Sequence, residues 1–271
     1  MKDYNNDASW LIENVWGKWG KDDEIGALND VTSADVVKAA SLIRTGKVYD
    51  LETVRFKGMP IWDGHIGFEL LTYGSPMGRR NMSKNSDYSP AYAWHKDGGW
   101  VASANDDFQI DANTEVMIAP MHMGTHIDGF CHITVGEDAH WYNGYNVSEY
   151  WGDFGPLKTD ATTIPPIILR GVLLDIAGYK GVDHVEPNYG ITPEDIEGCA
   201  AWEGIELKEK DCVLLRCGEH WPEMDHCPGA GMTLAAARYL VEEKGAVLLG
   251  DDMIAFEMNH ADGTMSWPRH P

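Results

Sequence analysis

The order of the predicted elements indicates a mixed α/β fold. Beyond residue 165, mostly apolar runs that are short enough for buried strands alternate with segments that carry helix start and stop signals. In chain order these are a strand at 167–175, a helix at 192–202, a strand at 212–216, a helix at 233–244 and a strand at 246–250. Strand–helix–strand order is typical of helices packed on a mixed sheet. Because no shift in composition divides the chain, we expect one domain over residues 1–271.

The two helices of this region are predicted from their ends. Thr192-Pro-Glu-Asp195 combines an N-cap residue, a proline at the first helical position and an acidic side chain three residues after the cap. Thr233 caps the second helix, and Gly245 ends it. The intervening runs are nearly all apolar, which favours buried strands.

Residues 1–46 are predicted to form a helical extension. Thr32 and Asp35 have the spacing of a capping box, which predicts a helix from there to about Gly46. The β-prone run 48–54 predicts a strand. Residues 57–115 are rich in glycine, proline, asparagine, aspartate and aromatic side chains, so we expect a long loop. Ordered loops of that length usually line sites or interfaces.

Charge and cysteine content limit the partners and the compartment. The 271 residues include 21 basic and 43 acidic ones, and the net charge of −22 repels nucleic-acid phosphates. The five cysteines are scattered and form no CxxC pair, which favours a reducing compartment. The sequence shows no signal-peptide core and no apolar run long enough to span a bilayer. We therefore expect a cytoplasmic protein that acts on a small molecule, without nucleic-acid or membrane partners.

The densest group of metal-ligating side chains is the segment His122-Met-Gly-Thr-His126-Ile-Asp128-Gly-Phe-Cys-His132. Two imidazoles and a carboxylate form a nitrogen and oxygen ligand set that suits a catalytic divalent metal with open coordination positions. A third histidine is able to transfer protons near neutral pH. Four polar residues on an exposed turn are the simpler explanation, but their density favours a metallohydrolase site.

The spacing of these residues restricts the backbone. On a regular helix Asp128 would lie about 120° around the axis from His122. On a strand the even-numbered side chains share a face, but four residues span about 13 Å, so the chain must tighten at Gly124. A turn at Gly129 would then bring His132 back over the metal. We predict a strand, a bend, a short strand and a turn. The odd-numbered side chains are expected to face the core: Met121, Met123, Ile127, Cys131 and Ile133.

Nearly the whole sequence is similar to one family. The pattern His122-x-Gly-Thr-His126-x-Asp128-x-x-x-His132 resembles the signature of the cyclase-like metal-dependent hydrolases, which include bacterial kynurenine formamidase and isatin hydrolase. Further similar segments are 19–29, 170–175, 228–231 and 250–257. The resemblance implies a swivelling β/β/α fold that assembles as a homodimer or higher homo-oligomer. It also implies hydrolysis of an amide, cyclic amide or lactone by a water on zinc or manganese.

The resemblance also assigns site residues, position by position. His122, His126 and Asp128 match the family's metal ligands, and His132 matches its catalytic histidine. A role of His132 as a metal ligand is the alternative. Trp62 resembles a wall residue of the substrate pocket, although a loop tryptophan packed on the core explains it equally well.

Two features depart from the family pattern. Phe130 stands two residues after the metal-binding aspartate, where relatives commonly have proline, and we expect it to form an aromatic wall near the substrate. The sequence ends at Pro271, whereas relatives continue into a segment whose histidine and glutamate complete a second metal site. With that C-terminal family segment apparently absent, we expect one ion, zinc or manganese, and leave a second open.

Two other functions fit the same ligands. A non-catalytic protein would bind a metal or a small ligand without turnover, but it would not need the proton-transfer group of His132. A non-haem Fe(II) oxygenase also uses two histidines and a carboxylate. A weaker signal comes from Arg216, His220 and His226, which would suit a substrate carboxylate, although exposed loop positions explain them better.

Overall fold

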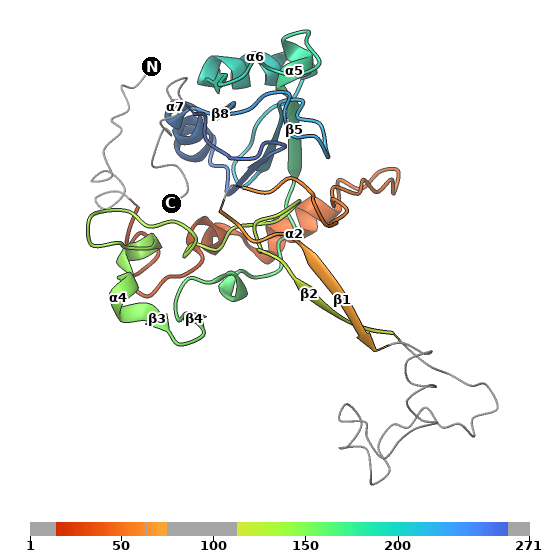
Figure 1. Cartoon of the computed structure of the whole chain (residues 1–271). Coiled ribbons are helices and arrows are strands. Elements are labelled where there is room, and N and C mark those ends of the chain that lie inside the picture. The colour runs from red at the N-terminus through yellow and green to blue at the C-terminus, as the bar shows by residue number, and fades with distance from the viewer. Residues whose placement is uncertain (1–14, 63, 75–112, 260–271) are drawn as a thin grey trace, which may run out of the picture. The chain divides into compact units, whose positions relative to one another are not determined.

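The computed structural model describes residues 15–62, 64–74 and 113–259 (Figure 1). The chain divides into two compact units: Met1–Thr53 together with Thr125–Pro271, and Val54–Gly124. The larger unit carries the described helices and a parallel sheet, and the smaller unit carries an antiparallel pair of strands. The expectation of one domain over residues 1–271 stays a prediction.

A three-stranded parallel sheet forms the centre of the larger unit. Its strands are β5 (Gly171–Asp175), β7 (Cys212–Arg216) and β9 (Leu248–Asp251), with β7 in the middle. β7 has the predicted bounds. The outer strands begin later than predicted, because Gly171 and Leu248 both lie opposite the first residue of β7. The register with the central strand therefore decides where the outer strands start.

Only one face of β5 is fully covered. Val172 and Leu174 are buried, whereas Leu173 between them is 56% exposed. The apolar run therefore overstated the burial of this strand, because alternate side chains of a strand point to opposite faces. The buried face packs into a core that the helices share, with these apolar side chains: Val172, Leu174, Ile176, Ile196, Val213, Leu215 and Leu240.

Three helices pack around this core. α5 (Ile176–Tyr179) follows β5 directly, and α6 (Pro193–Glu203) packs on both (Figure 1). α7 (Leu234–Arg238) contacts α6 and continues into a π-helical turn, η5 (Tyr239–Glu243). The helices predicted at 192–202 and 233–244 are confirmed, the second with a change of hydrogen-bond pattern after its first turns.

The capping box of α6 is also a tertiary link. Thr192 Oγ1 accepts from the backbone nitrogen of Asp195 at 3.3 Å, and Asp195 Oδ2 accepts from the backbone nitrogen of Thr192 at 3.1 Å. The same carboxylate accepts from Lys180 Nζ at 2.7 Å and from the Tyr189 hydroxyl at 2.8 Å. A local helix signal therefore joins α6 to the segment that follows α5.

The remaining elements of the larger unit are short. β3 (Trp151–Gly152) pairs with β4 (Gly155–Pro156), and β6 (Gly190–Ile191) pairs with β8 (Gly231–Met232). The short helices are α2 (Ser33–Ala40), α4 (Val147–Tyr150), η1 (Gly26–Asp30), η3 (Tyr142–Gly144) and η4 (Ala161–Thr163). In the part of the chain that the structure describes, no helix is long and apolar enough to cross a membrane.

Two predictions near the N-terminus are corrected. α2 has the predicted capping box at Thr32 but ends at Ala40, well before Gly46. It buries none of its residues, so no packing extends it beyond its local signals. Residues 48–54 form no strand, and Val48 is 88% exposed. Among the described residues no strand forms hydrogen bonds with this run. β-prone side chains alone do not make a strand, because strand stability depends on packing against neighbouring strands.

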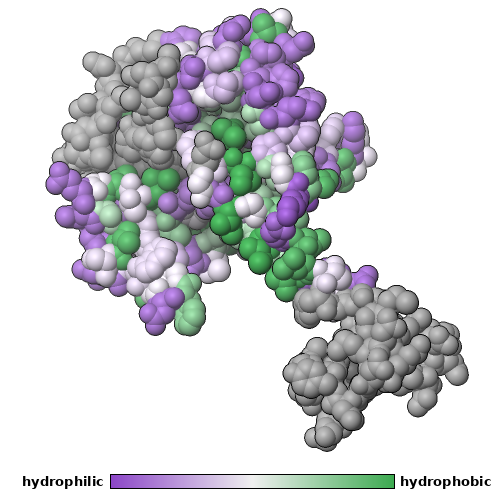
Figure 2. Space-filling model, viewed as in Figure 1, coloured by the Kyte–Doolittle hydropathy of each residue, from purple (hydrophilic) through white to green (hydrophobic). Residues whose placement is uncertain are grey.

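The smaller unit contains β1 (Glu69–Gly74) and β2 (Thr114–Ile118) in antiparallel register. The long irregular region predicted at 57–115 therefore includes strand residues, and its part at 75–112 lies outside the described residues. Leu70 lies opposite Met117 and Leu71 opposite Val116, so both faces of the pair are apolar. These side chains are exposed and form an apolar area (Figure 2).

The Asp195 carboxylate gives a test of this architecture. Burial raises its pKa, but the hydrogen bonds from Lys180, from the Thr192 backbone and from Tyr189 outweigh burial and lower it. Asp195→Asn should therefore reduce the free energy of unfolding at pH 7 by about 1–3 kcal/mol. A lowered native pKa stabilises the fold above the unfolded pKa of about 3.9, and this contribution disappears as the pH falls through the native pKa.

Urea unfolding at pH 7 and at successively lower pH values measures this effect. The gap between wild type and Asp195→Asn should narrow below about pH 4. Glu194→Gln changes an exposed carboxylate in the same helical turn and should leave the free energy of unfolding within about 0.5 kcal/mol of wild type. A gap that stays constant with pH would show that the charge of Asp195 is not the stabilising feature.

Candidate metal centre

Bends and turns, rather than helix or strand, form the segment that carries the candidate metal-ligating side chains. β2 ends at Ile118, and residues 119–133 contain neither helix nor strand. The predicted tightening at Gly124 is present, because its φ of +62° bends the chain. The predicted turn at Gly129 is also present, and the backbone nitrogen of His132 donates to the Gly129 carbonyl at 2.9 Å. The two predicted strands around the bend are absent.

The prediction that the odd-numbered side chains of this segment all face the core is wrong. Met123 is buried as expected, with 2% exposure, but Met121 is 81% exposed and Ile127 is 47% exposed. A period of two residues requires extended backbone, and the bend at Gly124 interrupts it.

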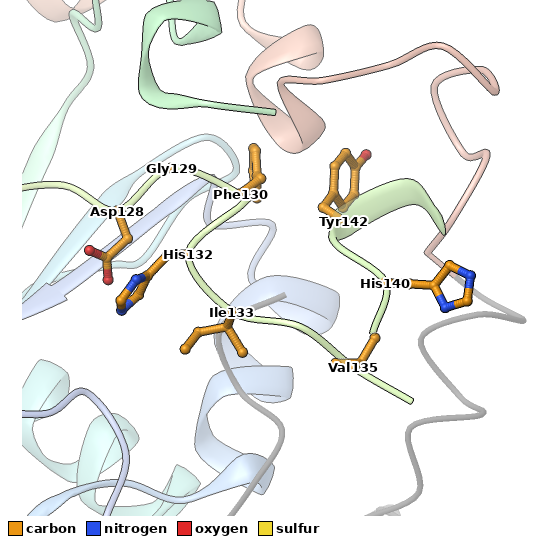
Figure 3. A pocket seen from close by; sticks show the side chains of 8 residues that line it. All are labelled: Asp128, Gly129, Phe130, His132, Ile133, Val135, His140 and Tyr142. Atoms are coloured by element: carbon orange, nitrogen blue, oxygen red, sulfur yellow. The ribbon is translucent and has the colours of Figure 1, made fainter. Parts of the chain in front are cut away.

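Three donor groups meet at one point. The ligand atoms of His122, Asp128 and His132 all lie within 4.8 Å of one another, and no other group of three such residues in the described chain does so. His126 is not in this group, but its Nε2 lies 3.3 Å from Asp128 Oδ1. Asp128 is therefore common to both sets of neighbours. Figure 3 shows the Asp128 carboxylate and the His132 ring side by side.

This donor set fits a divalent metal ion. Zinc–nitrogen and zinc–oxygen bonds are about 2.0–2.2 Å long, so two ligand atoms of one ion lie about 3–4 Å apart. Groups within 4.8 Å of one another reach this separation through small side-chain rotations. Imidazole nitrogen and carboxylate oxygen suit zinc, and a mixed set of this kind also suits manganese.

The turn after Asp128 is held by close contact with a distant segment. A Cβ atom at Gly129 would lie 2.9 Å from the backbone nitrogen of Ala161, so glycine alone permits this approach. The backbone nitrogen of Cys131 donates to the Thr159 carbonyl at 3.1 Å. These contacts fix the path of the chain between Asp128 and His132.

Phe130 lines a pocket beside the donor group. The pocket wall contains Asp128, Gly129, Phe130, His132, Ile133, Val135, His140 and Tyr142 (Figure 3). The Phe130 ring packs on Tyr142, with centroids 4.6 Å apart, and points away from the Asp128 carboxylate. A Cβ atom at Gly26 would lie 3.0 Å from the Phe130 ring. Phe130 thus anchors the turn to the N-terminal segment, and its expected contact with substrate stays a prediction.

Two carboxylates of this N-terminal segment support the pocket wall. The Tyr142 hydroxyl donates to Asp23 Oδ2 at 2.6 Å. Burial raises the pKa of Asp23, but hydrogen bonds from Tyr142, Asn29 and two backbone nitrogens outweigh it and lower the pKa. Glu24 accepts from Lys158 Nζ at 2.6 Å and from the Thr159 backbone nitrogen at 2.7 Å. The sequence assigned no role to these acidic residues, although they lie inside the family-like segment 19–29.

His65 is a second residue that the sequence did not reveal. The centroid of its ring lies 5.9 Å from that of His122, and its Nδ1 is buried with no hydrogen-bond partner among the described residues. A single histidine in an irregular region has no spacing signal to identify it. The backbone nitrogen of His65 donates to the carbonyl of Trp62, whose side chain is 38% exposed. The expected role of Trp62 in substrate binding stays a prediction.

Arg216 has a structural partner. Its Nη1 lies 2.9 Å from Asp175 Oδ1, and Nη2 donates to the Asp183 carbonyl at 3.1 Å. The guanidinium therefore joins the ends of β5 and β7 to the loop after α5, which leaves it less able to bind a substrate carboxylate.

Comparisons with known proteins identify the family. The family model described as Putative cyclase matches residues 49–258. A solved structure described as a novel cyclase is 24% identical, covers 90% of this chain and 78% of its own, and superposes with a TM-score of 0.71. This likeness confirms the expected cyclase-like α/β fold. No curated protein matches the chain.

Isatin hydrolase A structures from two bacteria are more distant. The Labrenzia aggregata protein is 16% identical over 86% of this chain and 75% of its own, with a TM-score of 0.44. The Ralstonia solanacearum protein is 14% identical over 89% of this chain and 80% of its own, with a TM-score of 0.48. The family match alone spans more than half of the sequence and includes the whole segment 122–132. The chain therefore belongs to the cyclase family.

Proposed function

We propose that the protein is a metal-dependent hydrolase that cleaves a C–N or C–O acyl bond in a small amide, formamide, cyclic amide or lactone. The observation that carries this proposal is the convergence of His122, Asp128 and His132 within 4.8 Å in a chain of the cyclase family. Two imidazoles and a carboxylate, of which His132 and Asp128 line a pocket, are the donor set of a hydrolytic metal site.

In this proposal His122, His126 and Asp128 hold one zinc or manganese ion. A divalent cation held by these residues would polarise the scissile carbonyl and would lower the pKa of a bound water to about 7. Asp128 orients the site, because both His126 and His132 lie beside it. Because Asp128 lies beside both His126 and His132, the geometry allows either histidine to be the third ligand. The sequence pattern of the family favours His126.

His132 is then the group that moves the proton. It is exposed at the rim of the pocket, next to Asp128 and His122. Its imidazole accepts a proton from the attacking water and returns it to the leaving nitrogen or oxygen. The apolar side chains of the pocket wall beside it, Phe130 among them, would contact a small substrate. We also propose that the Trp62 side chain contacts the substrate.

The reaction class is tested with metal-reconstituted protein. Isatin, an N-formyl aromatic amine and a small lactone are each supplied with and without oxygen, and products are followed by chromatography. We expect at least one substrate to be hydrolysed at equal rates in both atmospheres. A product that requires oxygen would establish the oxygenase alternative. Metal binding without turnover of any of the three would favour a binding protein.

A matched pair of substitutions tests the roles of the two neighbouring histidines. His132→Ala should lower kcat about 10²–10⁴-fold while the protein keeps its metal, because it removes the proton-transfer group and not a ligand. His126→Ala should lose metal and activity together. Elemental analysis and steady-state rates are measured on both. Metal loss in His132→Ala with retention in His126→Ala would exchange the two roles.

We also propose that the protein forms a homodimer or a higher homo-oligomer. The exposed apolar faces of β1 and β2 support this, since exposed apolar area of this kind usually marks an interface. Light scattering should give a mass of at least two chains. Met117→Lys should shift the protein toward one chain, because a buried lysine is costly. Glu115→Lys, in the same strand, is the control, and equal masses for all three proteins would contradict a role for this face.

A further inference from the structure

A second group of histidines lies outside the segment 122–132. His220 and His226 belong to the loop after β7, and His184 belongs to the loop after α5. The ring centroids of His184 and His226 are 5.4 Å apart, and those of His220 and His226 are 5.5 Å apart. All three rings therefore gather around His226.

The backbone holds the two loops together. The backbone nitrogen of Val185 donates to the Cys217 carbonyl at 2.9 Å. Gly218 has a φ of +90°, and a Cβ atom there would lie 2.2 Å from the Asp183 carbonyl oxygen. Only glycine permits this approach. His184 is thus held against the loop after β7 by the fold itself.

Each of the three rings has a hydrogen-bond acceptor beside its Nδ1 atom. The pairs are His184 Nδ1 with the Val185 carbonyl at 3.1 Å, His220 Nδ1 with Glu223 Oε2 at 2.6 Å, and His226 Nδ1 with Glu219 Oε1 at 3.3 Å. Carbonyl and carboxylate oxygens only accept, so Nδ1 carries the hydrogen in each neutral ring and Nε2 keeps its lone pair. An acceptor behind the non-ligating nitrogen is the common arrangement of metal-binding histidines.

Hydrogen bonds hold the Glu219 carboxylate in place behind the His226 ring. The Glu219 side chain is 2% exposed and accepts from the backbone nitrogens of His220, His226 and Cys227. Each carboxylate orients the imidazole that it contacts, and a carboxylate in this position offsets part of the charge of a cation bound to the ring.

The ring separations suit a shared metal ion. Two imidazoles on one ion, with metal–nitrogen bonds of about 2.0–2.1 Å, place their ring centroids about 5 Å apart. The ligand atoms of these three side chains do not all lie within 4.8 Å of one another, so binding of one ion requires a movement of the side chains, and His220 is 66% exposed. We propose that His184, His220 and His226 bind a second divalent transition-metal ion, of the kind that imidazole prefers, through their Nε2 atoms. This ion joins the loop after α5 to the loop after β7.

Zinc titration of chelator-treated protein tests this site. A competing chromophoric chelator reports the number of equivalents bound, and Asp128→Asn isolates the second site. The wild type should bind two equivalents, and Asp128→Asn should bind one. His220→Ala, at a side chain 66% exposed, should also bind one, and the double variant should bind none. In the Asp128→Asn background, zinc should raise Tm, and this shift should disappear in the double variant.

A substitution at Glu223, which accepts from His220, changes no proposed ligand and therefore tests the site even if His220→Ala folds poorly. Glu223→Gln should weaken zinc binding at the second site about 10–100-fold, because it removes the charged acceptor of His220. Glu149→Gln, an exposed carboxylate on α4, should leave it unchanged. If His220→Ala and Glu223→Gln retain wild-type stoichiometry and affinity, the second site does not exist. If Asp128→Asn binds two equivalents of zinc tightly, Asp128 is not a ligand of the first site. The number of equivalents that His220→Ala binds then decides whether the second site exists.

Discussion

The close approach of Gly129 to the backbone of Ala161 is the constraint on which the candidate metal centre depends. It leaves no room for a side chain, and the hydrogen bond from His132 to the Gly129 carbonyl closes the turn. Asp128 and His132 thereby come side by side although three residues lie between them. A regular strand or helix would not bring these groups and His122 together, so irregular backbone supplies the geometry of the site.

The N-terminal segment makes this irregular turn rigid. Gly26 has no side chain to crowd the Phe130 ring, Asp23 accepts from Tyr142, and Glu24 accepts from Lys158 and from a backbone nitrogen. Half-buried carboxylates are stable only with such hydrogen bonds, and once satisfied they hold their partners in one arrangement. Two of the acidic residues that make the chain strongly negative, Asp23 and Glu24, therefore help to position the pocket wall.

The two histidine groups use carboxylates in different ways. Asp128 lies among its imidazoles as a candidate ligand, whereas Glu219 and Glu223 lie behind theirs, on the side of Nδ1. In the first arrangement the carboxylate contributes charge directly to a cation, which suits a site that activates water. In the second it fixes the tautomer and the ring orientation, which suits a site that joins two loops.

Local signals in the sequence determined the caps at Thr32, Thr192 and Thr233 and the strand 212–216, since each depends on residues a few positions apart. The sequence also determined the donor types of the metal centre and the two glycines at which its chain turns. The tertiary structure decided where β5 starts, because β7 sets its register, and within the described part of the chain no strand pairs with residues 48–54. The tertiary structure also brings His132 into the donor group, places His65 beside His122 and places His184 beside His226. The physical reason is distance along the chain: a cap is complete within one helical turn, whereas convergence of side chains depends on backbone contacts between segments that no local pattern relates.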